Sequence, residues 1–274
     1  GAALAIDVGG YVVTARSAQN SADATALAVA TDCALDGAPI ADYSPYRKPG
    51  QVITTPACGD GEASITVTKE VEGILMRTSA GDVDRSATAA WGSIARANTL
   101  PLVISDCEFS YPGLEETADI TIYLDDTKPQ SGCSSLPGGF SQLAGDGCAV
   151  DISAGGTVPG DPGADLQKLV PCFTNPTGPA LPHDVLIPVY DASACAEAGC
   201  TGKGPYPILG FAVFTIGSYS FNGIAYAGDL GKKCPDDKER GRYCIRGDFT
   251  RFTTSQGTPG PSTDFGAYTV YLSD

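Results

Sequence analysis

The chain has 274 residues and carries 17 Lys and Arg against 32 Asp and Glu, which gives a net charge of −15 and a pI of about 4.3. Nucleic acids and anionic membrane surfaces both select for an excess of basic residues, so we expect neither as a partner. Apolar residues make up 42% of the chain, enough for a sizeable core, and the 34 Gly and 20 Pro favour a β-rich body with many turns.

The first 35 residues are predicted to form one helix, because residues 2–32 contain no Pro and are rich in Ala. Two interpretations stay open: the helix packs on its own domain, or it is the outer half of a helix that leaves a membrane. The segment 1–15 is too short to span a bilayer, and we expect it to be the end of a longer apolar segment. Gly9–Gly10 would mark a bend or the membrane exit. A four-then-three spacing predicts helix-packing contacts at Leu4, Val8, Tyr11, Ala15, Ala18 and Ala22.

The rest of the chain is predicted as a β-rich body broken by loops. A Pro-rich connection over 36–61 precedes an alternating run at 63–76, which predicts a half-buried strand. Residues 86–97 form either a strand or a short helix, and 127–182 is dominated by turn residues. Further strands are predicted at 100–105, 119–124, 185–190, 208–221, 249–254 and 267–273.

The ten cysteines are even in number and widely spaced, and the chain has no Cys-x-x-Cys pair. Zinc sites need such pairs or several histidines, and His183 is the single histidine. Disulfides therefore explain the cysteines better and indicate an oxidising, extracellular location. The spacing predicts the pairs Cys33–Cys58, Cys195–Cys200 and Cys234–Cys244, and it leaves three connectivities open among Cys107, Cys133, Cys148 and Cys172.

Two kinds of motif could bind a metal, and neither is complete. Asp191-Ala-Ser193-Ala-Cys195 resembles the metal loop of von Willebrand A domains, but its last position is Cys and no strand–helix alternation surrounds it. Loops 81–84 and 160–165 offer oxygen ligands for calcium without the spacing of an EF-hand. We predict no metal and no cofactor.

Catalysis has little support in the sequence. A hydrolase would need two carboxylates that converge in a pocket, whereas the acidic pairs at 115–116, 125–126 and 236–237 are adjacent in sequence and typical of solvated turns. There is no Gly-x-Ser-x-Gly elbow, and His183 lies in a Pro-rich loop. We therefore predict a protein without enzymatic activity and without catalytic residues.

Two further features could bind a partner. Arg246-Gly247-Asp248 spells an integrin-binding tripeptide, although a β-like run follows it and a match of this length is often chance. A row of aromatic residues would provide a carbohydrate-binding surface if it were exposed and a core if it were buried. The row comprises Tyr206, Phe211, Phe214, Tyr219, Phe221 and Tyr226.

The N-terminal stretch AALAIDVGGYVVTARSAQNSADATALAVATDC resembles the signature of Tad (Flp) pilus assembly proteins of the TadG/TadE-like family. Weaker similarity to actinobacterial TadG-related proteins extends over 88–92, 101–109, 121–124, 138–148, 210–214 and 244–252. The von Willebrand A domain of the larger family members has no counterpart here. The matching positions of the signature are Leu4, Ala5, Asp7, Gly9, Tyr11, Arg16, Gln19, Asn20, Ala22, Asp23, Ala24, Ala26, Leu27 and Ala28.

The resemblance implies a non-enzymatic pilin-like or assembly component of a Tad pilus, anchored in the membrane before assembly and exposed at the cell surface. Its partners would be other Tad-system subunits through the N-terminal helix and the membrane through an upstream segment. The predicted fold is α+β, with a pilin-like helix over 1–35 and a mostly antiparallel, disulfide-stapled β domain over 36–274. The alternative function is a secreted or surface-attached adhesion or carbohydrate-binding module.

Overall fold

The computed structural model describes residues 2–72, 79–109, 120–123, 140–144, 147–161, 169–173, 183–200, 204–221, 224–227, 243–254 and 257–273. The chain divides into two compact units. Unit 1 comprises residues 1–92 and 269–274, and unit 2 comprises residues 93–268. The boundary between the two units therefore does not lie after residue 35. The helix belongs to the same unit as the strands that follow it.

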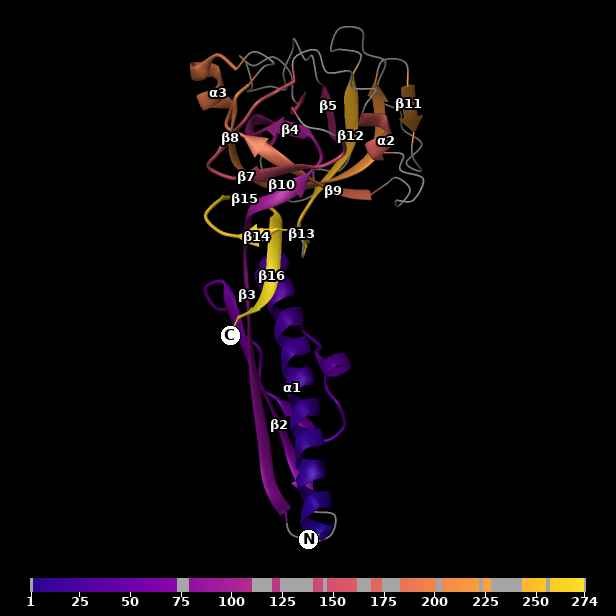
Figure 1. Cartoon of the computed structure of the whole chain (residues 1–274), viewed down its shortest axis with the longest axis vertical. Helices are drawn as coiled ribbons and strands as arrows, with labels where there is room; N and C mark the ends of the chain where they lie inside the picture. Colours follow the sequence, from indigo (N-terminus) through magenta and orange to yellow (C-terminus); the bar gives the residue numbers. More distant parts are fainter. Residues whose placement is uncertain are drawn as a thin grey trace. The chain divides into compact units, whose positions relative to one another are not determined.

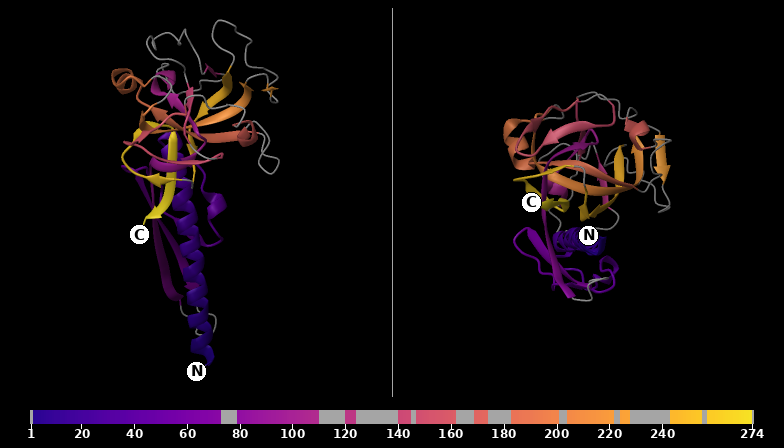
Figure 2. Two further views of the ribbon diagram at one scale, coloured as in Figure 1. Left: turned by 45° about the horizontal axis from the view of Figure 1, so that its top comes forward. Right: turned by 60° about the horizontal axis from the view of Figure 1, so that its bottom comes forward.

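Unit 1 is a long helix lying along an antiparallel sheet (Figures 1 and 2). The helix is continuous for 35 residues. The sheet order is β1-β2-β3-β16, in which β1 pairs antiparallel with β2 and β2 with β3. The elements are α1 (Ala2–Asp36), the 3-10 helix η1 (Ser44–Tyr46), β1 (Gln51–Ile53), β2 (Glu62–Glu72), the first part of β3 (Ser79–Thr99) and the last part of β16 (Ala267–Ser273).

The core of unit 1 is made of small and β-branched residues from the helix and the sheet. Alternate residues of β2 point toward the helix, as the two-residue period of a strand requires, and Ile65 and Val67 are almost fully buried. They pack in one cluster with Ala18, Ala22 and Ala26 of α1. The disulfide Cys33–Cys58 joins the end of α1 to the chain that enters β2, which confirms that predicted pair.

Unit 2 is built around a sheet of order β5-β12-β10-β9-β4-β6. Most neighbours are antiparallel, whereas β4 runs parallel to β9 and β15 parallel to β10. The strands are β4 (Leu102–Ser105), β5 (Ile120–Tyr123), β6 (Phe140–Gln142), β7 (Val150–Ser153), β8 (Thr157–Val158), β9 (His183–Tyr190), β10 (Tyr206–Phe221), β11 (Ile224–Ala227), β12 (Cys244–Thr250), β13 (Phe252–Thr253), β14 (Thr258–Pro259) and β15 (Thr263–Phe265). The helical turns are η2 (Asp106–Phe109), α2 (Val170–Phe173) and α3 (Ala192–Ala198).

Strand β10 is the centre of unit 2 and is buried on both faces. Phe214 and Ile216 belong to one core cluster, whereas Phe211 and Val213 belong to another. Both clusters consist of residues of unit 2. A strand that is covered on both faces has no polar face, which explains why 208–221 reads as a nearly continuous apolar run.

The predicted α+β class is confirmed: a long N-terminal helix precedes mostly antiparallel sheets stapled by disulfides. Residues 86–97, open between strand and helix in the sequence, belong to β3. Among the four cysteines with three possible connectivities, Cys148 pairs with Cys172. Cys107 and Cys244 are disulfide-bonded. Cys133 and Cys234 lie outside the described residues.

Candidate functional site

The alanines of the predicted packing seam of α1 are buried inside its own unit, whereas its Tyr11 is exposed. Ala18 and Ala22 are fully buried and Ala15 nearly so. Ala18 and Ala22 contact the cluster around β2, and Ala15 packs with Val71 and Val83 of the β2–β3 hairpin. The alanines permit the close approach that the sequence predicted, but the surface they approach belongs to the same chain. For these three alanines the burial favours the interpretation in which the helix packs on its own domain.

The helix is uncovered about one turn before Ala15, at a level that includes the predicted seam residue Tyr11. Tyr11, Val12 and Val13 are 40%, 42% and 69% exposed, respectively. Successive residues of a helix point about 100° apart, so exposure at three consecutive positions means that more than half of the helix circumference is open at this level, while Gly10 and Thr14 are half-buried. α1 remains helical through Gly9 and Gly10, so the two glycines do not interrupt it. The side chains of Leu4 and Val8 lie outside those that the structure describes.

Val12 and Val13 are candidate contact residues that the spacing argument missed, because they fall between the positions of the seam. The signal that could have found them is the unbroken apolar run Tyr11–Val12–Val13, which ends three residues before Arg16. Such a run makes more than half of the helix circumference apolar at one level, whereas a helix packed on one sheet needs only a narrower apolar stripe.

Two glutamine side chains hydrogen-bond the helix to the sheet just after the uncovered turn. The Gln51 side-chain amide donates to the Ser17 carbonyl oxygen at 3.3 Å, and its amide oxygen accepts the Lys48 backbone N–H at 2.8 Å. The Gln19 amide donates to the Ser86 carbonyl oxygen at 3.2 Å, and to Asp23 at 2.7 Å. These bonds tie α1 to both β1 and β3. The uncovered turn at Tyr11–Val13 therefore precedes a part of α1 that is held by polar contacts as well as by packing.

Among the described residues, no helix is long and apolar enough to cross a membrane.

The Asp191 motif is a helix cap in the structure. Its carboxylate accepts the Ala194 N–H at 2.9 Å, as an N-cap residue does. Asp106 accepts the N–H of Ala192 in the same turn at 2.9 Å, and burial raises the pKa of the Asp106 carboxyl. Within the described part of the chain, no three His, Cys, Asp or Glu side chains gather as a metal site.

Cys195 and Cys200 are buried free thiols rather than the predicted disulfide. They flank the end of α3, where Gly199 takes a left-handed conformation with φ 71° and the Cys200 N–H donates to the Cys195 carbonyl oxygen at 2.9 Å. The Cys200 thiol donates to the Pro205 carbonyl oxygen at 3.0 Å. Burial, together with a hydrogen bond to the Cys200 thiol, raises the pKa of Cys195 to about 12.

The Arg-Gly-Asp tripeptide lies inside the sheet of unit 2. Its three residues belong to β12 and pair with β10, and Arg246 and Gly247 also pair with β5. A side chain at Gly247 would meet the Thr215 carbonyl oxygen at 1.9 Å, so the two backbones are in direct contact there. An integrin-binding tripeptide must present its Arg and Asp together on an exposed loop, and a paired strand does not do so.

The aromatic row does not form a binding surface. Tyr206, Phe211, Phe214, Tyr219 and Phe221 are each at most 3% exposed. The Phe214 ring packs on Phe249 with centroids 4.8 Å apart, and Tyr219 stacks with Phe221 at 5.1 Å. The side chain of Tyr226 lies outside those described. Buried rings favour the scaffold interpretation over the carbohydrate-binding one.

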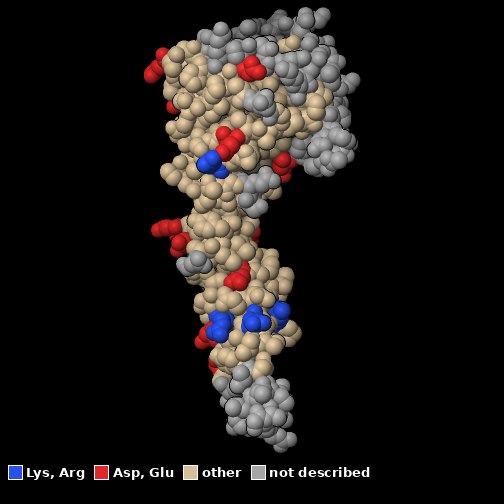
Figure 3. Space-filling model, in the orientation of Figure 1, with Lys and Arg blue, Asp and Glu red and all other residues tan. Residues whose placement is uncertain are grey.

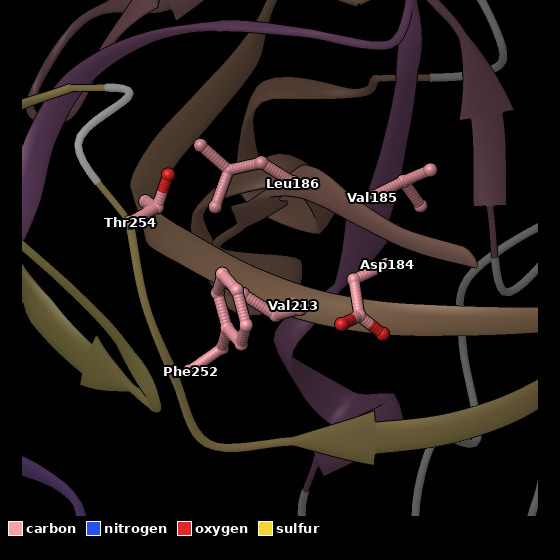
Figure 4. Close-up of a pocket in the computed structure, with 6 residues that line it drawn as sticks. All are labelled: Asp184, Val185, Leu186, Val213, Phe252 and Thr254. Atoms are coloured by element: carbon pink, nitrogen blue, oxygen red, sulfur yellow. The ribbon is translucent and has the colours of Figure 1, made fainter. Parts of the chain in front are cut away.

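Unit 2 has a small open pocket of about 140 Å³ between β9, β10 and the segment after β12 (Figure 4). Val185, Leu186, Val213 and Phe252 supply an apolar lining, with Thr254 also at its edge. Asp184 is the one carboxylate among the described lining residues, and it accepts a hydrogen bond from Thr215 at 2.5 Å. Its described lining therefore does not bring together the pair of facing carboxylates that glycoside hydrolysis uses. His183 begins β9, and its side chain lies outside those described.

Comparison with known proteins adds no assignment: no family model, curated protein or solved structure matches the chain.

Proposed function

We propose that the protein is a non-enzymatic, pilin-like or assembly component of a Tad-type pilus. In this role α1 anchors the chain in a membrane or among other subunits, and the β-rich part is exposed outside the cell. The proposal of a Tad-type pilus, as opposed to another surface assembly, rests on the resemblance of residues 2–33 to the TadG/TadE-like signature. The observation that carries the role is structural: α1 is sealed on its own sheet from Ala15 onward and uncovered at Tyr11–Val13.

The uncovered turn supports an anchoring role because exposed apolar residues mark places where a protein meets a partner or a membrane. A helix that only completed a core would have a polar outer side at this level. The disulfides Cys33–Cys58 and Cys148–Cys172 are consistent with this role, since they indicate an oxidising environment outside the cytoplasm.

The proposal is tested by placing a charge on the uncovered turn. Val13→Asp should abolish pilus assembly, because a carboxylate is costly in a membrane or an apolar helix–helix contact. Val13 is 69% exposed, so unit 1 should fold normally. Assembly is measured by the amount of pilus protein sheared from cells in which the variant replaces the normal chain, and folding by circular dichroism of the purified variant.

Val52→Asp is the matched control. Val52 is 65% exposed and lies on β1 of the same unit, so the substitution introduces the same charge at an equally open valine. Cells with V52D should assemble pili at the normal level. Normal assembly with V13D, or equal loss with both variants, would contradict the proposal.

A further inference from the structure

The basic residues of unit 1 gather in one band, which we call the basic band: Arg16, Arg47, Lys48, Lys69 and Arg85. These are all five Lys and Arg that the structure describes in unit 1. In a chain of net charge −15, a random distribution would intersperse them with the more numerous acidic residues. Figure 3 shows neighbouring blue side chains at one level of the molecule.

Gln51 stands at the centre of the basic band. Its side chain bonds Lys48 and the carbonyl oxygen of Ser17, the residue after Arg16. Its register partner on β2 is Lys69. Arg85 of β3 lies opposite Val67, two residues along β2 from Lys69. These contacts bring basic residues from α1, the η1–β1 connection and both strands of the hairpin to one place.

The strand pleat separates these charges from the acidic residues of the same hairpin. Lys69 and Arg85 are half-buried on the helix side, with Val67 and Val83. Glu70, Asp82 and Asp84 alternate with them and are exposed, so they point to the opposite face. Asp84 accepts a hydrogen bond from Thr68 on that face at 2.6 Å. Among the described residues, none of the five basic side chains forms an ion pair.

The basic band lies directly beside the uncovered turn of α1. Arg16 and Lys48 are exposed, and Arg16 follows Val13 by less than one helical turn. Proteins that bind a membrane surface often carry exposed Tyr and Val next to exposed Arg and Lys. The apolar side chains then enter the acyl chains, and the cationic groups lie at the level of the lipid phosphates.

From this geometry we infer that the basic band binds the anionic phospholipid headgroups of the membrane from which α1 emerges. The inference rests on the proposed function and deepens it, because it assigns a lipid class to the same end of unit 1. It also revises the expectation from the overall charge that the chain avoids anionic membranes. Folding concentrates the few basic residues of unit 1 where the helix is uncovered.

The test is flotation of the purified 274-residue chain with vesicles of phosphatidylcholine alone, or of equal parts phosphatidylcholine and phosphatidylglycerol. We expect binding to the vesicles with phosphatidylglycerol that weakens as salt is added. Arg16→Gln with Lys48→Gln removes two exposed charges without touching the core. A basic residue near a charged bilayer changes binding about fivefold, so this variant should bind about twenty-five-fold more weakly.

Lys232→Gln with Lys233→Gln is the matched control, since it removes the same two charges from a stretch outside unit 1. It should bind as the unaltered chain does. Equal binding to both vesicle types, or equal loss in both double variants, would overturn the inference.

Self-association that is lost in the Arg16/Lys48 variant, with vesicle binding unchanged, would also overturn it and assign the band to an acidic surface of a second copy. Pilus assembly by V13D decides the proposed function separately, because that variant leaves the basic band intact.

Discussion

At the scale of single residues, Cys195 and Cys200 come together because of the way α3 ends. The helix stops at Gly199, whose positive φ returns the chain so that the Cys200 N–H reaches the Cys195 carbonyl. This helix end brings the residues on either side of the turn into contact. Their short spacing correctly indicated that they are neighbours in space. It did not determine the chemical state of the sulfur atoms, because a thiol pair and a disulfide fit the same turn.

We predict that the two thiols react slowly in the folded protein. Burial raises the pKa of Cys195 to about 12, which leaves about a thousandfold less thiolate at a given pH than an ordinary thiol would have. Because the thiolate is the nucleophile, iodoacetamide should label Cys195 faster as the pH rises. Denaturation without reductant should expose both residues to rapid labelling, measured on their peptides by mass spectrometry. Peptides of Cys195 and Cys200 that stay unlabelled after denaturation and appear linked would instead show a disulfide.

At the scale of elements, α1 shows which part of a packing interface can be predicted from a sequence. The spacing of Ala15, Ala18 and Ala22 identified the buried stripe, because a helix repeats its faces every three to four residues. The spacing could not identify the covering surface, since a strand with alternating Ile65 and Val67 offers the same apolar contact as a second helix. That information lies in the pairing of β2 with β3, which involves residues far from α1 in sequence.

We predict that Ala22→Leu destabilises unit 1. Ala22 is fully buried against the sheet, and extra methylene groups in a filled core cost about 1–3 kcal/mol. The measurement is the midpoint of chemical unfolding, followed by the circular dichroism of the helix. Asn20→Leu introduces the same side chain at an exposed position of α1 and should leave the midpoint nearly unchanged. An unchanged midpoint for A22L would contradict the packing of this seam on its own sheet.

At the scale of the whole molecule, the least predictable feature is where the chain divides. The sequence favoured a boundary after the helix, because residues 36–61 look like a linker. Instead, β3 runs for 21 residues and belongs to both units, and β16 does so as well. The pattern of a long strand does not reveal that its two halves have different partners, here β2 for the first half and β7 for the second.

Each unit has its own core and its own described disulfide, so removal of one disulfide should act mainly on the unit that contains it. Cys33–Cys58 and Cys148–Cys172 close loops of nearly equal length, with separations of 25 and 24 residues. Loop-closure entropy then assigns each about 3–4 kcal/mol of stability. Replacing Cys33 and Cys58 with Ala should speed hydrogen exchange in α1 and β2, while β9 and β10 stay protected.

Replacing Cys148 and Cys172 with Ala is the reciprocal experiment. Leu169 and half-buried Cys172 pack on the core around β10, so this change should speed exchange in β9 and β10 and leave α1 protected. Two variants with equal loop lengths and opposite exchange patterns would show that the chain has two separately stabilised units. If either variant accelerates exchange equally in α1 and β10, the units unfold together, because cooperative unfolding exposes every amide at the same free energy.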